Sequence, residues 1–264
     1  MHNEIITIGN FTIYGYGLMI AIGIVLAYFT AEFRAKRLGL ESKNVFPLTV
    51  CAVVFGLFGA KLLYWITVID EIIANPKMML DLADGFVVYG GIIVGIVACF
   101  IYSKIKKFGL LPYMDLILPS VALAQAFGRL GCFLAGCCYG KETDSACHIV
   151  FTESQFAPNN VQLIPTQLFS SGLNFLHFAV LVIIARKVKK PGIVSACYLI
   201  FYSVGRFILE FFRGDIERGS VGALSTSQFI SIFILIAGVV MLVVCMKYQK
   251  KEAQVDEVEE EKES

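Results

Sequence analysis

The stretch TSQFISIFILIAGVVMLVVCM, residues 226–246, contains no charged side chain. A run of about 20 apolar residues is long enough to cross the ~30 Å hydrocarbon core of a bilayer as a helix. Six further predominantly apolar runs of similar length lie near residues 11–33, 46–66, 86–104, 112–131, 167–185 and 193–212. The sequence therefore predicts an all-α, polytopic membrane protein with seven transmembrane helices.

The composition also indicates a membrane protein. Hydrophobic residues make up 57% of the 264 and charged residues 16%, whereas soluble domains are about 45–50% apolar and about 25% charged. The first residues, MHNEIITIGN, place no basic segment ahead of the first apolar run. We therefore expect that run to stay in the membrane and not to be a cleaved signal peptide. The formal net charge of +1 indicates nothing about partners, because the distribution of charge matters more than its sum in a membrane protein. We expect no nucleic-acid partner.

Basic and non-basic loops alternate along the chain. Lysine and arginine gather after the first, third, fifth and seventh runs, at Arg34, Lys36, Arg37 and Lys43, at Lys104, Lys106 and Lys107, at Arg186, Lys187, Lys189 and Lys190, and at Lys247, Lys250 and Lys251. Because basic loops stay in the cytoplasm, we predict that the N-terminus is outside and the C-terminus cytoplasmic. Residues 1–246 then form the membrane domain, and the highly charged residues 247–264 are predicted to be a disordered cytoplasmic tail.

Polar side chains from five of the predicted helices fall at the outward-facing depth. Arg129 ends the fourth run, Arg206 and Glu210 lie in the outer third of the sixth, and the remaining ones stand at outer helix starts, namely Tyr14, Tyr16, Tyr89 and Gln167. Ionisable side chains in a membrane normally face the interior or a water-filled cavity, and they are functional candidates by default. The pattern indicates a site that opens to the outer leaflet.

The two deeper arginines suggest an anionic ligand. Arg206 and Glu210 are four residues apart and are expected to pair on the helix. A purely structural ion pair is the alternative, and Arg213 is expected only to extend to the membrane interface. A guanidinium group donates bidentate hydrogen bonds to phosphate. Arg129 and Arg206 therefore favour a phospholipid headgroup.

Five stretches resemble one family of enzymes. GRLGCFLAGCCYG, residues 128–140, is similar to the signature of the prolipoprotein diacylglyceryl transferases, Gly-Arg-x-Gly-Asn-Phe followed by a glutamate and a glycine. Four more stretches agree with that family in order, namely YGYGLM at 14–19, YGGIIVG at 89–95, IPTQLF at 164–169 and YSVGRFILEFFR at 202–213. The resemblance covers nearly the whole chain and includes the seven-helix arrangement with the N-terminus outside.

The resemblance implies a transferase of the bacterial inner membrane. Such an enzyme moves the diacylglyceryl group of phosphatidylglycerol to the thiol of a prolipoprotein signal-peptide cysteine and releases glycerol phosphate. Its partners would be phosphatidylglycerol, prolipoprotein signal peptides and membrane lipids, with no cofactor. The residues implied for catalysis are Arg129, Arg206, Tyr89 and Cys137, and those implied for substrate binding are Tyr16, Gly128, Gly131, Cys132, Gly140, Gln167, Tyr202 and Glu210.

Four positions depart from the family pattern. Tyr89 and Ile164 stand where the family has histidine, Cys132 where it has asparagine, and Cys137 where it has glutamate. Tyrosine and cysteine have reference pKa values of about 10 and about 8.5, so neither replaces a histidine or a carboxylate directly. The chain is interpreted as a divergent transferase. A phospholipid-binding or transport protein without catalysis, or a thiol-redox membrane protein, are the alternatives.

The eight cysteines fall into two groups. Four lie inside predicted helices and are expected to be small buried residues, namely Cys51, Cys99, Cys197 and Cys245. The outward-facing ones are Cys132, Cys137, Cys138 and Cys147. We favour a disulfide from Cys147 to Cys137 or Cys138, while a reactive thiol, free packing and metal binding together with His148 stay open. The spacing matches no strong zinc pattern, so no metal is predicted.

The predicted orientation is tested by two reporter fusions. A reporter that is active only in the cytoplasm should be active when fused after Ser264. A reporter that is active only outside the cytoplasm should be active when inserted near Asn160. That loop has no excess of basic residues, and seven helices put the two termini on opposite sides, so both observations place the loop outside. A cytoplasmic location of the loop at 141–163 would contradict the placement of the whole site.

Overall fold

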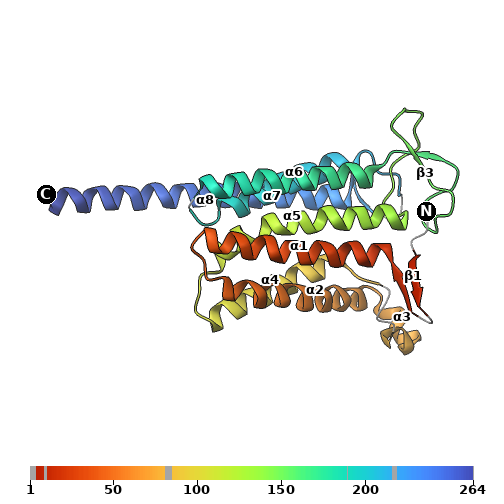
Figure 1. Cartoon of the computed structure of the whole chain (residues 1–264), viewed down its shortest axis with the longest axis horizontal. Coiled ribbons are helices and arrows are strands. Elements are labelled where there is room, and N and C mark those ends of the chain that lie inside the picture. The colour runs from red at the N-terminus through yellow and green to blue at the C-terminus, as the bar shows by residue number, and fades with distance from the viewer. Residues whose placement is uncertain (1–3, 9–10, 81–84, 189, 216–218, 264) are drawn as a thin grey trace. The chain divides into compact units, whose positions relative to one another are not determined.

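The computed structural model describes residues 4–8, 11–80, 85–188, 190–215 and 219–263, with side chains described as far as Lys247. Within these residues, seven helices are long and apolar enough to cross a membrane, as predicted. They are α1 (Gly15–Arg37), α2 (Val45–Thr67), α4 (Val88–Ile105), α5 (Leu110–Ala135), α6 (Thr166–Lys187), α7 (Ile193–Glu210) and α8 (Thr226–Glu263) (Figure 1).

The remaining elements are short. They comprise the strands β1 (Glu4–Ile8), β2 (Phe11–Tyr14), β3 (Ile149–Val150), β4 (Gln162–Leu163), β5 (Ser220–Val221) and β6 (Leu224–Ser225), the helix α3 (Ile69–Ala74), and the 3₁₀ helices η1 (Ser42–Asn44) and η2 (Pro76–Leu80). The strands form three antiparallel pairs, β1 with β2, β3 with β4, and β5 with β6. The fold class is therefore all-α with small hairpins between the long helices.

The predicted start of the first transmembrane helix is wrong by one turn. Residues 11–14 form β2, which pairs with β1, and α1 begins only at Gly15. Thr7 faces Thr12 in this pairing, and their hydroxyl oxygens are 3.3 Å apart. The β-branched and aromatic residues of FTIY favour a strand, although their apolar character reads as helix in a hydropathy window. Tyr14 thus ends a strand, while Tyr16 lies on the helix.

The chain forms two compact units, Glu32–Tyr113 on the one hand and Met1–Ala31 with Met114–Ser264 on the other. In the unit 32–113, α2 and α4 pack antiparallel through glycines. A Cβ on Gly59 would lie 2.5 Å from the Gly90 carbonyl oxygen, and one on Gly91 would lie 2.7 Å from that of Gly56. Small residues of this kind let helix backbones approach closely in a membrane. Tyr89 lies beside this contact, in the first turn of α4.

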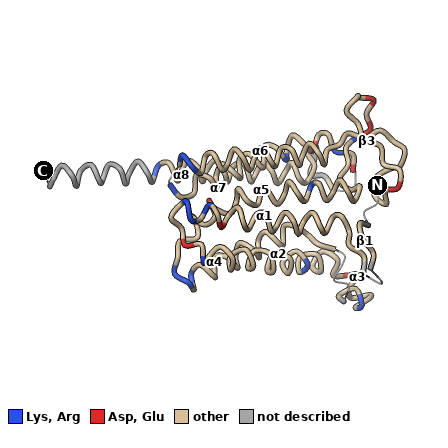
Figure 2. Tube along the Cα trace, in the orientation of Figure 1, with Lys and Arg blue, Asp and Glu red and all other residues tan. Residues whose placement is uncertain are grey.

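The larger unit has its core between α5, α6 and α7. Ala122, Leu181, Ala185, Val194 and Tyr198 are buried against one another, and α8 packs along α7, with Gly238 beside Leu199 and Ile200. Figure 1 shows α5, α6 and α7 running side by side. In the unit 32–113, most lysines and arginines gather at one end of the helices (Figure 2), which is the distribution used to predict orientation. That orientation stays a prediction.

The cysteines within the helices differ in exposure. Of the four cysteines expected to be buried in helices, Cys99 is buried and Cys51, Cys197 and Cys245 are partly exposed.

The last helix, α8, runs to Glu263, whereas the sequence predicts a disordered tail from residue 247. The side chains of 248–263 lie outside the described part, so the boundary between domain and tail stays a prediction.

Asp115 is a charged residue within α5 whose carboxylate is satisfied by hydrogen bonds to the start of α7. Its carboxylate accepts hydrogen bonds from the backbone N–H of Gly192 at 2.6 Å, from the N–H of Ser195 at 2.7 Å and from the Ser195 hydroxyl at 2.5 Å. Gly192 directly precedes α7, and the first N–H groups of a helix have no partner within it. An acidic group also interacts favourably with the helix dipole there. Asp115 therefore fixes the start of α7 on α5.

Replacing this carboxylate is expected to destabilise the fold. Asp115→Ala leaves three donors without their acceptor, which costs about 1–3 kcal/mol, or a fall in melting temperature of roughly 2–12 °C for a chain of this size. Asp115→Asn, which keeps one acceptor oxygen, should lose less. The measurement is thermal unfolding in detergent, with Asp144→Ala in an exposed loop as the matched control. Equal melting temperatures for Asp115→Ala and the control would contradict the capping role.

Candidate functional site

The end of α5 folds back on itself. Gly136 has φ +73°, its N–H donates to the Phe133 carbonyl at 3.2 Å, and the Cys137 N–H donates to the Cys132 carbonyl at 3.1 Å. This pair of bonds, with a glycine in the left-handed region, is the Schellman motif that ends many helices. It brings residue 137 back over residue 132. The local sequence CFLAGC therefore places two thiols side by side.

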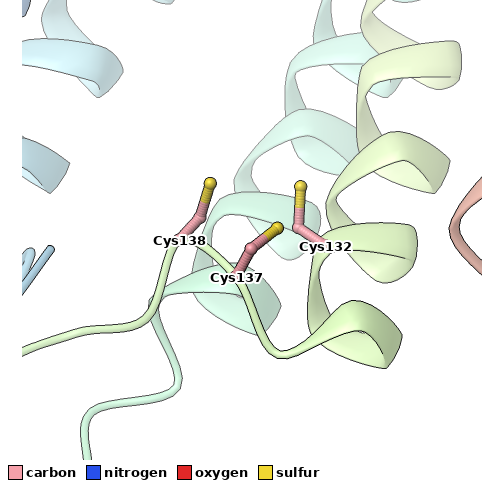
Figure 3. A group of neighbouring side chains, drawn as sticks. All are labelled: Cys132, Cys137 and Cys138. Carbon is pink, nitrogen blue, oxygen red and sulfur yellow. The ribbon is translucent and has the colours of Figure 1, made fainter. Parts of the chain in front are cut away.

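A third thiol joins them. Cys138 also has a positive φ, +60°, and the sulfur atoms of Cys132, Cys137 and Cys138 all lie within 4.8 Å of one another. We call these three residues the thiol cluster. Figure 3 shows Cys137 between the other two, whose side chains point in the same direction. Cys132 is buried, and Cys137 and Cys138 are partly exposed, so one side of the cluster is accessible.

The backbone after the cluster crosses two other segments. The Gly140 N–H donates to the Ile164 carbonyl at 3.1 Å, and the Lys141 N–H donates to the Phe212 carbonyl at 2.9 Å. The Gly214 N–H in turn donates to the Tyr139 carbonyl at 3.1 Å. These bonds connect the end of α5 to the start of α6 and to the end of α7.

Two side chains of α6 hold the backbone of the cluster itself. Gln167 Nε2 donates to the Cys137 carbonyl at 2.9 Å, and the Thr166 hydroxyl donates to the Cys138 carbonyl at 2.9 Å. Gln167 is 1% exposed, and its Oε1 is buried without a hydrogen-bond partner among the described residues. A buried, unsatisfied acceptor is uncommon in native proteins and calls for an explanation, such as a bound ligand.

Two arginines of α7 and the loop after it are oriented by carboxylates. Arg206 Nη2 lies 2.7 Å from Glu210 Oε2, with side-chain exposures of 13% and 7%, and it donates to the Ser227 hydroxyl at 2.7 Å. The predicted pair on one helix is thus confirmed. Arg213 donates from Nε to Asp215 Oδ1 at 2.9 Å and is 6% exposed. Arg213 is thus held by Asp215, and its extension to the membrane interface stays a prediction.

Arg129 completes a group of three guanidinium groups. It lies within electrostatic range of Arg206, Cys132 and Cys138, and Arg213 acts on both Arg206 and Cys138. Among the described residues no carboxylate is paired with Arg129, whereas Glu210 and Asp215 pair with the other two. Three positive charges against two negative ones leave an excess of positive charge beside the thiols. An anion is the ligand that such an excess favours.

The cluster has an uneven affinity for protons. Hydrogen bonds from the Cys132 and Cys137 thiols lower the pKa of Cys138, and the charges of Arg213 and Arg129 lower it further. The hydrogen bonds that the Cys137 thiol donates to Cys132 and Cys138, together with burial, raise the pKa of Cys137. The assignment of Cys137 as the catalytic thiol stays a prediction.

The structure brings most of the predicted site residues together. Tyr16, at the start of α1, lies in electrostatic range of all three thiols and of Arg129, and its carbonyl oxygen would be 3.1 Å from a Cβ on Gly131. Tyr202 stacks on Tyr198 with ring centroids 6.0 Å apart and acts on Arg206. Tyr89 belongs to the other unit, 32–113.

Sequence reasoning missed Cys138, Asp215 and Ser227 as site residues. The first two had a signal, because Cys138 lies within the cysteine signature and Asp215 follows Arg213 by two residues. Cys147 and His148 do not belong to the thiol cluster. Cys147 has a free, exposed thiol, so the favoured disulfide to Cys137 or Cys138 is not formed. His148 Nδ1 is instead 2.8 Å from the Ser145 carbonyl oxygen of its own loop.

Fold and site together define a multi-pass membrane protein with a cationic, thiol-bearing site where α5, α6 and α7 meet. Residues 3–244 match the family described as prolipoprotein diacylglyceryl transferase, and the chain belongs to this family. It is 49% identical over 227 residues to the phosphatidylglycerol–prolipoprotein diacylglyceryl transferase of Clostridium tetani, covering 86% of this chain and 91% of the relative.

Two further relatives extend the similarity. The phosphatidylglycerol–prolipoprotein diacylglyceryl transferase 2 of Clostridium perfringens is 45% identical over 230 residues, covering 87% of this chain and 90% of the relative. The phosphatidylglycerol–prolipoprotein diacylglyceryl transferase of Finegoldia magna is 33% identical over 254 residues, covering 94% and 98%. The similarity thus includes the whole membrane domain, which confirms the family resemblance.

Proposed function

We propose that the chain transfers the diacylglyceryl group of phosphatidylglycerol to the thiol of a signal-peptide cysteine in prolipoproteins, at the outer face of the bacterial inner membrane. The observation that carries the proposal is the group of three guanidinium groups formed by Arg129, Arg206 and Arg213. Membership of the transferase family supports it. The alternatives, lipid transport without catalysis and thiol redox chemistry, are not favoured.

Arg206 and Arg129 contribute to phosphate binding in different ways. Glu210 and Ser227 hold the Arg206 guanidinium in one orientation, so it needs little reorganisation when charge develops nearby. Arg129 has no carboxylate partner among the described residues, and its planar fork suits two phosphate oxygens. During transfer the bond from the glyceryl carbon to the phosphate oxygen breaks and the carbon–sulfur bond forms. Glycerol phosphate leaves with the bonding electrons, and preorganised positive charge stabilises it.

Space for the lipid lies beside the arginines. A Cβ on Gly128 would meet no atom within 4 Å, and neither would one on Gly205. Each of these glycines directly precedes an arginine, Gly128 before Arg129 on α5 and Gly205 before Arg206 on α7. A lipid can therefore approach both helix backbones next to the guanidinium groups. The unsatisfied Gln167 Oε1 is available to accept a hydrogen bond from a headgroup hydroxyl or a peptide N–H.

Tyr16 and Tyr202 border the arginines and the thiols and are proposed to contact substrate. The catalytic assignment of Tyr89 depends only on the resemblance of YGGIIVG to the family segment. We place the N-terminus outside and the C-terminus in the cytoplasm, which puts the site at the outer surface, where prolipoprotein signal peptides emerge.

The phosphate-binding role is tested in a strain depleted of its own diacylglyceryl transferase. Arg129→Ala and Arg206→Ala should each lower transfer by about 10²–10³-fold, the usual effect of removing one preorganised stabiliser. Lysine at either position should restore transfer only in part, because a point charge lacks the bidentate fork. The readout is growth, together with the mass of a lipoprotein's N-terminal peptide.

Arg186→Ala is the matched control, since Arg186 lies in the last turn of α6, at the opposite end from Gln167. It should support growth as the unchanged protein does. Wild-type transfer by Arg129→Ala or Arg206→Ala, at equal protein levels, would remove that residue from the phosphate site.

A further inference from the structure

The thiol cluster has the composition of a site for a thiophilic metal ion. Its three sulfurs come from the last turn of α5 and the turn that follows, and all lie within 4.8 Å of one another. A tetrahedral zinc ion with Zn–S bonds of about 2.3 Å holds its sulfurs about 3.8 Å apart. The sulfurs therefore need to close by about 1 Å, which small side-chain rotations accomplish.

The surroundings of the cluster suit such an ion. Gln167 and Thr166 hydrogen-bond the carbonyl groups of Cys137 and Cys138, and outer partners of this kind fix the orientation of metal ligands. Three thiolates around a divalent ion carry one net negative charge. Arg213 hydrogen-bonds Cys138, and the positive charge of Arg129, which no carboxylate of the described residues pairs, lies close enough to balance that charge.

We propose that Cys132, Cys137 and Cys138 bind a thiophilic metal ion, with zinc(II) the expected occupant, and that the acceptor cysteine thiol takes its fourth coordination position. A set of three sulfur ligands selects zinc or copper(I) over magnesium or calcium. Catalytic zinc sites typically use three protein ligands and leave one position open for water or substrate. The partial exposure of Cys137 and Cys138 leaves a side from which a signal-peptide cysteine can approach.

The metal supplies the activation that the acceptor thiol needs, a role that rests on the proposed function. A thiol that coordinates zinc loses its proton outright, here to water at the membrane surface. The bound sulfur then attacks the glyceryl carbon, the carbon–sulfur bond forms, and the carbon–oxygen bond to phosphate breaks. Glycerol phosphate leaves with the electron pair of that bond. No atom changes oxidation state, and the thioether product, which carries no charge, dissociates from the metal.

Metal binding is tested directly on the full chain. Protein purified without oxygen and loaded with zinc or cobalt(II) should hold one ion per chain, and cobalt should show the sulfur-to-metal charge-transfer band of a thiolate site. Cys132→Ser and Cys138→Ser should weaken binding at least about tenfold, the effect of losing even an outer partner of a metal ligand. Cys147→Ser, in the exposed loop, is the control and should bind as the unchanged protein does.

A second readout needs no variant that might fold poorly. Zinc should protect Cys132, Cys137 and Cys138 of the unchanged protein from alkylation, while Cys147 reacts in its presence and absence. Failure of the unchanged protein to bind either metal would overturn the site. The site would also be overturned if Cys132→Ser and Cys138→Ser bound the metal as tightly as the unchanged protein does, or if the anaerobic protein contained a disulfide within the cluster.

The role of the open position has its own test. A signal peptide with its cysteine should shift the cobalt spectrum, and the same peptide with serine should not. An unchanged spectrum with the cysteine peptide would overturn the fourth-ligand claim. A shift in a protein that transfers no lipid would support the site while contradicting the proposed function, so the two failures are distinguishable.

Discussion

The site depends on a backbone crossing at Gly140. There the chain leaving α5 passes between the start of α6 and the end of α7 and hydrogen-bonds to both. A Cβ on Gly140 would lie 2.5 Å from the Ile164 carbonyl oxygen, and one on Gly214 would lie 2.5 Å from the Gly140 carbonyl oxygen. Only glycine permits this approach. The crossing brings the thiol cluster of one segment to Arg213 of another.

Charge balance explains why so many ionisable groups persist at the helix ends. Removing an arginine from water is costly unless hydrogen bonds and opposite charges replace the solvent. Glu210 and Asp215 provide hydrogen bonds and opposite charges for Arg206 and Arg213. The guanidinium group of Arg129 is left to bind a ligand. The surplus positive charge of Arg129 attracts an anionic headgroup to the side of the thiol cluster. The phosphate to be displaced and the thiol to be alkylated thereby meet in one place.

Much of this architecture could be predicted from the sequence, because the deciding signals are local. Predominantly apolar runs of about 20 residues predicted all seven helices, and the four-residue spacing predicted the pair of Arg206 with Glu210. What failed depended on partners far along the chain. The contact of Asp115 with the start of α7 joins residues far apart in the sequence. The sequence predicted Cys147 as a disulfide partner of Cys137 or Cys138, but the turn at Gly136 places the free thiol of Cys137 beside that of Cys132 instead. FTIY was read as helix because strand pairing with residues 4–8 is invisible to hydropathy.

The central claim is that one site binds phosphatidylglycerol and alkylates a thiol with its diacylglyceryl group. The most direct measurement uses the purified protein in vesicles of phosphatidylglycerol with a labelled headgroup, together with a signal peptide that carries one cysteine. The account predicts one molecule of labelled glycerol phosphate released for each thioether formed, and no release with the matching serine peptide. Lipid that crosses the bilayer without forming a thioether, or glycerol phosphate released without the cysteine peptide, would contradict it.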